Sequence, residues 1–325
     1  MFKSDLYTRK SCLLFIVFLS IALSGASCRS TAVSPSKDVT PPEGLKNIHG
    51  TQLYYKAMGK GQPIFFLHGR SGSHRYFLPY MEPLADEYQL LFYDQRGTGS
   101  SDGKIDLKAI SIDQFVEDLE ALRLAFGFEK ISLMAHSSGT VIALFYAFKY
   151  QAHLDKLILV DPLPVTNRFV AEQLQTLKQR SQHLSPEGQQ MLTTACRRSD
   201  TELSPEVRTG CLKLDAALRF YDPAKAVMMD TTPEKNTARN AITIESLLTT
   251  SLNRKQHDID ANLKAIRVPT LIIHGDFDPI PIGSSEYIQQ HISTSQLIVM
   301  KQSGHFPFVE QPEQFVAAVR AFMRP

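Results

Sequence analysis

Short, uninterrupted apolar runs recur along the chain, and they constrain its fold more than any other feature. Each run ends in turn residues, and amphipathic segments separate the runs. Apolar strands of this kind are covered on both faces, as in a parallel sheet. The alternation predicts a doubly wound α/β domain of eight strands. An early hairpin turns at Gly50, and the core strands are expected at 63–69, 90–95, 131–136, 156–161, 270–275 and 296–300.

The alternation stops between residues 163 and 268. This segment is rich in Gln, Thr, Arg and Glu, has helical spacing, and contains no convincing core strand. Because the chain then re-enters the sheet at 270–275, a helical cap explains the segment better than a second independent domain does. The predicted core is therefore divided into 46–162 and 269–325, with the cap inserted after the sixth strand.

The clearest of the core helices is expected at 111–126. Its apolar residues recur at helical spacing and form one stripe, and Ser111 with Gln114 can form a capping box at its start.

The overall charge limits the partners. The formal net charge of the 325 residues is +2 and no long basic run occurs, so a nucleic-acid partner is not expected.

The stretch LMAHSSGT, at 133–140, places two serines directly after a predicted strand. A nucleophilic serine in a tight strand-to-helix turn needs small residues two positions before it and two after it. Ser137 has Ala135 and Gly139 there, whereas Ser138 has histidine and threonine, which are too bulky. We therefore predict Ser137 as the nucleophile, with the N–H of Ser138 as an oxyanion donor at the start of the next helix.

The partners of such a serine follow on later loops. A serine hydroxyl needs a general base, and the base needs an orienting acid. His305 comes shortly after the last predicted strand and is the expected base. Asp276 and Asp278 both follow the preceding strand. Asp276 begins the turn and is suited to bonding the local backbone. Asp278 lies further out, where it can reach the histidine, so we favour Asp278 as the acid.

Two further stretches carry a family resemblance. FFLHGRSG, at 65–72, matches a His-Gly loop, and the segment Asp94 to Ser101 is close to an Asp-Gln-Arg-Gly-x-Gly-x-Ser signature. With the serine, acid and histidine in this chain order, residues 46 to 325 resemble the α/β-hydrolase fold, and within it most the proline iminopeptidase group. The resemblance implies a mostly parallel eight-stranded sheet with helices on both faces and a helical cap. It also implies a second oxyanion N–H from Arg70, and neither a cofactor nor a metal ion.

Two departures from that group concern specificity for proline. The loop reads HGRSG where the group typically has His-Gly-Gly-Pro-Gly, and the chain contains no tryptophan. A pyrrolidine ring would therefore have to pack on other aromatic residues of the cap, with candidates Phe169, Phe220 and Tyr221. A free N-terminal amine would need a cap carboxylate that faces the site, with candidates Glu172, Glu202, Glu206, Glu234 and Glu245.

These features together predict a serine hydrolase that acts on a small molecule or a short peptide. The first interpretation is an aminopeptidase that releases N-terminal residues through an acyl-enzyme. A carboxylesterase or lactonase with the same triad is the alternative. A non-catalytic binding protein on the same fold fits less well, because the Ser-Asp-His set is intact. The histidines His68, His136 and His274 each end a different strand, and we interpret them as structural. The oligomeric state is left open.

Residues 1–28 have the pattern of an export signal. Basic residues precede an uncharged apolar run at 13–23, which is shorter than the roughly 20 residues that a bilayer requires but suits a signal peptide. The following SGASCRS resembles a bacterial lipoprotein box, which implies cleavage before Cys28, acylation of that residue and a location in the cell envelope. Residues 29–45 have the composition of a flexible tether.

Other outcomes for this leader stay open. Gly25 stands where lipoprotein boxes usually carry leucine. Ordinary signal cleavage after Ala26 would give a periplasmic or secreted protein, and an uncleaved leader would give a membrane anchor. Contact with a membrane is expected only through this N-terminal segment.

Cys196 and Cys211 both lie in the predicted cap. In an exported protein such a pair can form a disulfide, worth roughly 3 kcal/mol for a loop of this length. Two free buried thiols are the alternative. Metal binding is the weaker interpretation, since no histidine lies near either cysteine.

Overall fold

The computed structural model describes residues 42–69, 72–102, 106, 110–197, 205–229, 235–252 and 258–324. The expected signal peptide with Cys28, most of the expected tether, and Arg70 lie outside these residues. No helix in the described part of the chain is both long enough and apolar enough to cross a bilayer.

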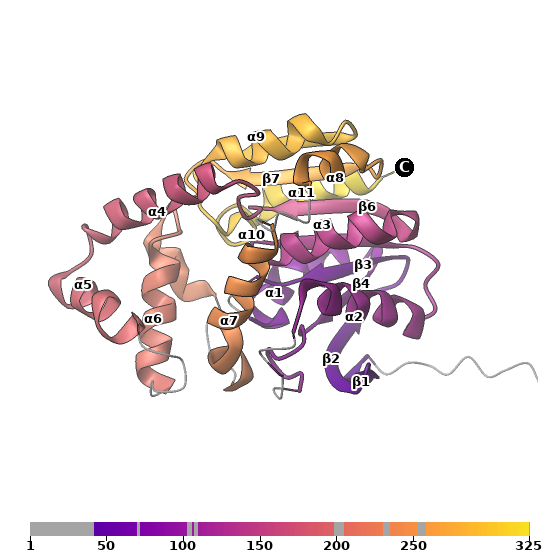
Figure 1. Cartoon of the computed structure of the whole chain (residues 1–325), viewed down its shortest axis with the longest axis horizontal. Coiled ribbons are helices and arrows are strands. Elements are labelled where there is room, and N and C mark those ends of the chain that lie inside the picture. The colour runs from indigo at the N-terminus through magenta and orange to yellow at the C-terminus, as the bar shows by residue number, and fades with distance from the viewer. Residues whose placement is uncertain are drawn as a thin grey trace, which may run out of the picture. The chain divides into compact units, whose positions relative to one another are not determined.

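One sheet of eight strands runs through the described residues, in the order β1-β2-β4-β3-β5-β6-β7-β8 (Figure 1). The pairs β1/β2 and β2/β4 are antiparallel, and the other neighbouring pairs are parallel. The mostly parallel sheet predicted from the apolar runs is confirmed. The strands are β1 (Glu43–Ile48), β2 (Thr51–Met58), β3 (Gln62–Leu67), β4 (Tyr88–Tyr93), β5 (Ile131–His136), β6 (Leu154–Val160), β7 (Thr270–Gly275) and β8 (Ser295–Met300).

The first hairpin turns where the sequence predicts it, but it begins earlier than expected. His49 and Gly50 both have positive φ, 48° and 77°, as a tight two-residue hairpin turn requires. Glu43 already pairs with Lys56, so residues 43–45 belong to the sheet and the predicted tether to residue 45 is too long. The reason is that β1 is a largely exposed edge strand, and its backbone pairing leaves no apolar pattern in the sequence.

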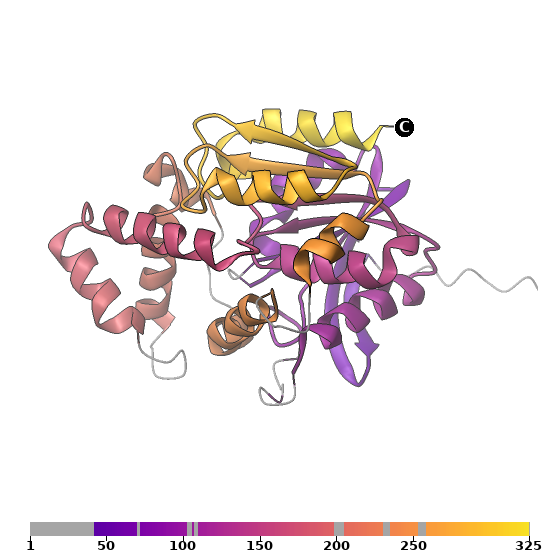
Figure 2. The ribbon, with the colours of Figure 1, turned by 45° about the horizontal axis from the view of Figure 1, so that its top comes forward.

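Helices cover both faces of the sheet, and two apolar clusters fill the space beneath them. Neighbouring strand residues enter different clusters: Phe65 joins one with α2, α3 and α9, while Phe66 joins the other with α1 and α11. Figure 2 shows α9 and α11 on opposite sides of the strands. These helices are α1 (Leu78–Met81), α2 (Ile112–Ala125), α3 (Gly139–Tyr150), α9 (Ile282–His291), α10 (Pro307–Glu310) and α11 (Pro312–Met323).

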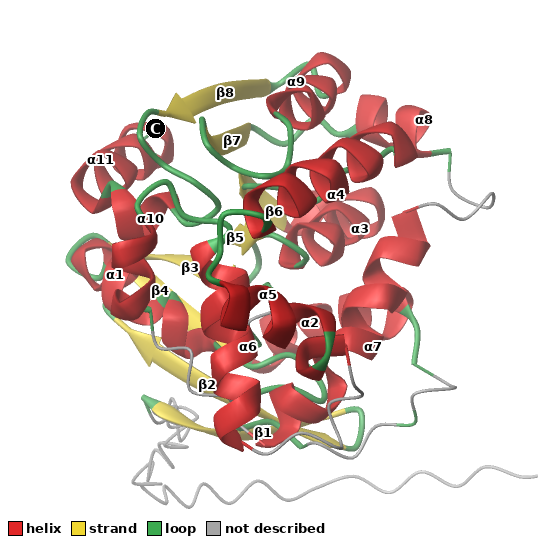
Figure 3. Ribbon diagram, turned by 90° about the vertical axis from the view of Figure 1, so that its left-hand side faces the viewer, coloured by secondary structure: helices red, strands yellow, loops and turns green. Residues whose placement is uncertain are grey.

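The segment between β6 and β7 is helical in its described parts. Figure 3 views the molecule from the left-hand side of Figure 1, and there α4, α5 and α6 lie in front of the sheet. The last two helices behave differently, because Leu248 of α7 and Leu263 of α8 are buried in the core cluster that contains α3. A disulfide joins Cys196 to Cys211 within this segment. Its helices are α4 (Asn167–Ser181), α5 (Pro186–Thr193), α6 (Pro205–Ala217), α7 (Lys235–Leu252) and α8 (Ile259–Ala265).

Helix α2 shows how local sequence and packing agree. Ser111 accepts a hydrogen bond from the N–H of Gln114 at 3.4 Å, as the capping pattern predicts, and the apolar stripe of α2 faces the core. The buried Glu120 on the same helix accepts hydrogen bonds from Arg123 and from Tyr146 of α3. Burial alone would raise the pKa of Glu120, but the hydrogen bonds from Arg123 and Tyr146 lower it to about 2.

We predict that Glu120→Gln removes stability in a pH-dependent way. A carboxylate whose folded-state pKa is lowered stabilises the fold above its unfolded pKa of about 4.3, and this contribution disappears as the pH falls through the folded value. The free energy of unfolding should be about 2 kcal/mol lower in the variant at neutral pH. The difference should shrink between pH 4 and pH 2. Urea unfolding of both proteins across this range measures it; a constant difference would contradict the prediction.

Candidate active site

Ser137 lies in a strained turn between β5 and α3. Its φ is 53°, a left-handed value that a non-glycine residue rarely adopts. Its N–H donates to Val160 O at 3.0 Å. The small residue predicted two positions later is required by close packing, since a Cβ on Gly139 would lie 2.6 Å from Leu67 O. The turn therefore has the steric constraints that favour Ser137 over Ser138.

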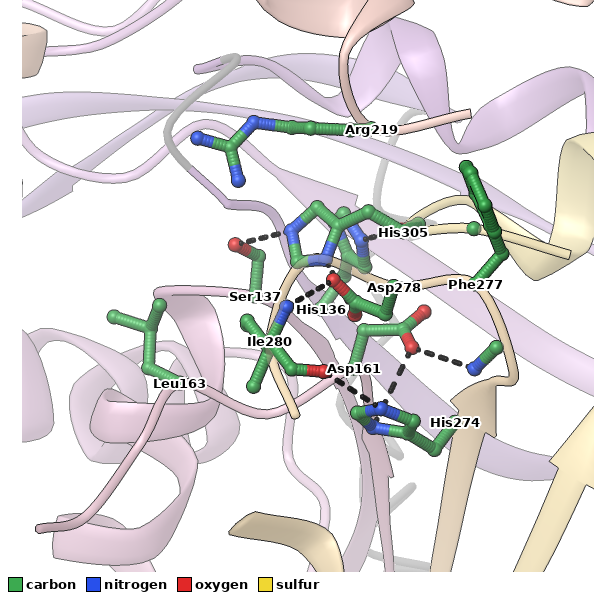
Figure 4. A network of polar contacts seen from close by, with 12 residues as sticks. His136, Ser137, Asp161, Leu163, Arg219, His274, Phe277, Asp278, Ile280 and His305 are labelled. Carbon is green, nitrogen blue, oxygen red and sulfur yellow. Dashed lines mark hydrogen bonds and ion pairs between the residues drawn. The ribbon is translucent and has the colours of Figure 1, made fainter. Parts of the chain in front are cut away.

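The structure brings Ser137, His305 and Asp278 together (Figure 4). Ser137 Oγ lies 2.8 Å from His305 Nε2, and His305 Nδ1 lies 2.8 Å from Asp278 Oδ2. A carboxylate accepts, so Nδ1 carries the proton and Nε2 is free to accept from the serine hydroxyl. This is the geometry of a nucleophile, a base and an orienting acid.

Asp278 is a buried anion. Burial by itself would raise its pKa, but the adjacent His305 and the hydrogen bond between them hold the pKa below its ordinary value. Its other oxygen accepts from the N–H of Ile280 at 2.9 Å. The neighbouring Asp276 has a different role, because its Oδ1 accepts from the N–H of Ser303 at 3.3 Å. Asp276 thus ties its turn to the next loop, and the choice of Asp278 over Asp276 agrees with the geometry.

The loop that carries His305 is bound to the end of the cap helix α6. The N–H of His305 donates to Arg219 O at 2.7 Å. The preceding residue has to be glycine, since a Cβ on Gly304 would lie 2.0 Å from that same oxygen. Glu310 adds a second link, accepting from the N–H groups of Gly304 and Asp222. The position of the histidine therefore depends on cap backbone.

The expected oxyanion donors are described only in part. Ser138 caps the N-terminus of α3, where backbone N–H groups lack intrahelical partners. A small cavity of about 10 Å³ adjoins Ser138 and Gly69. A Cβ on Gly69 would lie 2.8 Å from Cβ of Ser137, so the His-Gly loop borders the nucleophile. Arg70 itself lies outside the described residues, and its N–H stays a prediction.

A buried tyrosine links the His-Gly loop to the His305 loop. The N–H of Gly69 donates to Tyr76 Oη at 2.6 Å, and Tyr76 Oη lies 2.9 Å from His136 Nδ1. His136 Nε2 lies 2.7 Å from His305 O. A carbonyl only accepts, so His136 carries its proton on Nε2 and Tyr76 donates to Nδ1. Burial lowers the pKa of His136 well below its ordinary value, which keeps the ring neutral.

The remaining strand-end histidines are also held by hydrogen bonds. His274 contacts Ser285 Oγ and Ile280 O, at 2.9 and 3.1 Å. His68 contacts Gly69 O through Nδ1, and its Nε2 accepts from the N–H of Gln95. Two groups of buried side chains come within 4.8 Å of one another in a way that could suit a metal ion: His136 with Asp161 and His305, and Asp161 with His274 and Asp278. Existing hydrogen bonds occupy both ring nitrogens of each of these histidines, so we assign no metal to either group.

A cavity of about 330 Å³ opens onto Ser137 and His305 from the cap. Its wall is mostly apolar, with charged groups from two cap helices: Glu245 of α7, and Arg219 beside α6 paired with Asp215 at 3.0 Å. The wall comprises His136, Ser137, Leu163, Pro164, Val170, Gln173, Leu174, Leu177, Asp215, Arg219, Glu245, Thr249, His305 and Phe306.

The aromatic residue in this wall is Phe306, which the sequence reasoning missed. Phe220, one of the expected residues, instead stacks on Phe306 from behind, with ring centroids 4.9 Å apart. Phe169 packs on Tyr287 of α9, and Tyr221 packs edge-on against Phe277. The three aromatic residues expected from the sequence therefore do not line this cavity, whereas Phe306 does. Its place directly after His305 was the available signal.

The cap glutamates also separate into groups. Only Glu245 lines the cavity among those that the structure describes. Glu172 is half-buried and paired with Arg168, and Glu206 is exposed. Glu202 and Glu234 lie outside the described residues. In the signature segment Asp94 to Ser101, Asp94 accepts a hydrogen bond from the N–H of Ser100 and Arg96 donates to Asp118, so both residues hold the glycine-rich turn.

Comparison with known proteins agrees with this architecture. A family model described as the alpha/beta hydrolase fold matches residues 62–312. The chain belongs to the α/β-hydrolase family. Its sequence relatives include a proline iminopeptidase from Saccharolobus solfataricus, 29% identical over 86% of this chain and 92% of the relative. Another, from Thermoplasma volcanium, is 32% identical over 84% of this chain and 93% of the relative.

Solved α/β hydrolases share the fold. A thermophilic esterase from Thermogutta terrifontis superposes with a TM-score of 0.66 at 22% identity, over 87% of this chain and 98% of the esterase. At this identity the likeness concerns the fold alone. The hydrolase described here thus has iminopeptidases among its sequence relatives and an esterase among its structural neighbours.

We predict that Tyr76→Phe lowers the stability of this hydrolase. The substitution leaves the N–H of Gly69 and Nδ1 of His136 without a partner in a buried place, which should lower the free energy of unfolding by about 1–3 kcal/mol. Tyr80→Phe is the matched control, because the Tyr80 hydroxyl bonds Met228 O at the surface. Urea unfolding measures both variants. Equal losses in the two would show that the buried link has no special weight.

Proposed function

We propose that this α/β hydrolase is a serine hydrolase, and specifically an aminopeptidase that releases N-terminal residues from short peptides. Ser137 Oγ attacks the acyl carbonyl while His305 Nε2 takes the serine proton. His305 then delivers this proton to the leaving amine, and an acyl-enzyme forms. Water attacks the acyl-enzyme with the same histidine as base. Asp278 holds the tautomer of His305 throughout.

The charge that develops in this reaction needs donors that are already in place. The N–H groups of Ser138 and Arg70 are the proposed oxyanion donors, at the start of α3 and after the His-Gly loop. Removal of one such donor typically lowers kcat by about 100- to 1,000-fold. The position of Ser138 at the helix N-terminus supports the first donor. The second rests on family resemblance and on the contact between Gly69 and Ser137.

Glu245 is the observation that carries the aminopeptidase assignment. It lines the same cavity as Ser137 and His305, and its Oε2 is buried with no hydrogen-bond partner within the described part of the chain. A buried carboxylate oxygen without a partner is unfavourable. The ammonium group of a substrate would supply the missing donor and charge. Asp215 cannot serve equally well, because Arg219 already pairs with it.

The sequence relatives support the same assignment, since proline iminopeptidases match most of this chain. The substrate residue would then lie with its amine at Glu245, its side chain on Phe306, and its carbonyl at Ser137. The chain has no tryptophan on which a pyrrolidine ring could pack. We therefore propose proline as one of several small residues that this wall can hold.

A carboxylesterase is the second candidate, and the apolar wall of the cavity favours it. Leu163, Val170, Leu174 and Leu177 face the cavity together with Phe306. A short acyl chain could bury its surface on these side chains without any charged partner. The two candidates differ in whether Glu245 is needed.

Export of the protein belongs to the same proposal. The leader at 1–28 has the features of a lipoprotein signal. The disulfide between Cys196 and Cys211 is compatible with an oxidising compartment. Acylation at Cys28 would hold the hydrolase at a membrane surface in the cell envelope.

The first experiment compares the wild type with Ser137→Ala, Glu245→Gln and Glu172→Gln. The substrates are a prolyl arylamide, other aminoacyl arylamides, an N-blocked prolyl arylamide and a short-chain aryl ester. Ser137→Ala should lose activity by about 10⁴-fold or more. Glu245→Gln should lower kcat/KM for the free-amine substrates by about 30-fold and leave ester cleavage within about threefold. Glu172→Gln is the matched control, because Glu172 does not line the cavity, and it should behave as the wild type.

Each outcome decides between the candidates. Cleavage of free-amine substrates that is lost on blocking the amine and reduced in Glu245→Gln would support the aminopeptidase. Ester cleavage alone, dependent on Ser137 and indifferent to Glu245, would leave the esterase. Turnover by Ser137→Ala at the wild-type rate would remove Ser137 from the mechanism.

For export, we predict that the full chain expressed in a bacterial host incorporates labelled palmitate and partitions into the membrane fraction. Cys28→Ala should abolish the label. Cys12→Ala, which changes the other cysteine of the leader, should keep it. Soluble, unlabelled protein from the wild type would argue for ordinary signal cleavage.

A further inference from the structure

Asp161 is a second buried carboxyl group beside the triad, directly after β6. It is fully buried, and its φ is 44°, so its backbone is strained in the same sense as that of Ser137. Its N–H donates to Ile273 O at 2.8 Å, and its Oδ1 accepts from the N–H of Gly275 at 2.9 Å. Strained backbone of this kind is stabilised by surrounding structure and is concentrated at functional sites.

The carboxyl group of Asp161 lies close to that of Asp278. No N–H or hydroxyl group in the described residues donates to Asp161 Oδ2. An oxygen of Asp161 lies within 4.8 Å of an oxygen of Asp278, and Figure 4 draws the two carboxyl groups side by side. Two ionised carboxylates buried this close repel each other, so a single proton held by the pair stabilises it.

The hydrogen bonds indicate which of the two carries that proton. Both oxygens of Asp278 accept, one from His305 Nδ1 and the other from the N–H of Ile280. Among the described residues, Asp161 accepts only at Oδ1, from Gly275. A proton on Asp161 Oδ2 would turn the unpartnered oxygen into a donor toward Asp278. A proton on Asp278 would instead weaken its bond to the histidine.

The surrounding charges favour the same placement. Burial raises the pKa of Asp161 well above its ordinary value, and the negative charge of Asp278 raises it further. His274 Nδ1 stands 3.8 Å from Asp161 Oδ1, but its ring is occupied by Ser285 and Ile280. The titratable groups that face Asp161 are His136 on β5, His274 on β7, Asp278 after β7, His305 after β8 and Glu310 on α10.

We propose that Asp161 is a positioning residue for the triad: a neutral carboxylic acid that donates a hydrogen bond to Asp278 and holds it against His305. The inference rests on the triad proposed above and adds a fourth member to it. A neutral donor orients Asp278 without adding a second charge to a buried site.

The test compares Asp161→Asn with Asp161→Gly. Asparagine keeps a donor toward Asp278 and an acceptor for Gly275, and it tolerates positive φ. Glycine tolerates the same φ but removes the group altogether. Asp276→Asn, on the neighbouring turn, is the matched control. Ser137→Ala is the blank. Thermal unfolding checks that each variant is folded.

The readout is the rate at which a fluorophosphonate phosphonylates Ser137. This reaction needs no knowledge of the substrate: Oγ bonds to phosphorus, fluoride leaves, and the serine proton passes to His305. Asp161→Asn should react within about threefold of the wild type at neutral pH. Asp161→Gly should react roughly 10- to 100-fold more slowly, with the loss in the maximal rate and not in the half-saturating reagent concentration.

The pH profile separates a positioning role from a merely structural one. A raised pKa means that Asp161 carries its proton below that pKa and loses it as the pH rises through it. The wild-type rate should therefore fall on the alkaline side, where two charges would then repel each other. Asp161→Asn cannot ionise and should keep its rate there. Equal losses in the asparagine and glycine variants, or identical alkaline limbs in wild type and Asp161→Asn, would overturn the proposal.

Proton NMR provides a readout that does not depend on catalysis. The proton between His305 Nδ1 and Asp278 should give a far-downfield resonance in the wild type and in Asp161→Asn, and it should be lost or shifted in Asp161→Gly. If the wild type is not phosphonylated but the resonance behaves in this way, the proposed function fails and the role of Asp161 stands. A resonance unchanged in all variants would remove that role.

Discussion

The contact between the Ser137 turn and the end of β3 is the constraint on which the rest of the site depends. Gly139 lies so close to Leu67 O that no side chain fits between them, and Gly69 lies equally close to Ser137. The backbone at Ser137 is consequently held at a positive φ, and Oγ points at the histidine. The parallel sheet makes this contact possible, since it brings the carboxyl ends of β3 and β5 side by side.

The parts of the fold that follow from local pattern could be predicted. The buried strands are continuous apolar runs, and the turn after β5 requires small residues at fixed positions, so the strands and Ser137 could be read directly. His305 and Asp278 follow from chain order along the same sheet edge. The edge strand β1 could not be predicted to its full length, because it is held by backbone pairing and its side chains are largely exposed.

Other features depend on contacts between distant segments, which leave no local signal. Nothing in the sequence near Glu245 distinguishes it from the other cap glutamates; its burial comes from the way α7 packs on the core. Phe306 lines the cavity where Phe220 was expected, because Phe220 stacks on Phe306 and is not part of the wall. Asp161 ends a predicted strand and carries no functional signal in the sequence. Its proximity to Asp278 appears only in the folded structure.

The loop that carries His305 is anchored on a backbone carbonyl of the cap, and this limits the exchange of caps between such hydrolases. His305 is anchored on Arg219 O, with Gly304 pressed against the same carbonyl, and Glu310 spans the two segments through Gly304 and Asp222. The cap therefore cannot be treated as an interchangeable module. A chimaera that receives a foreign cap would have to bring a carbonyl to the same point in space, or His305 would lose its position relative to Ser137.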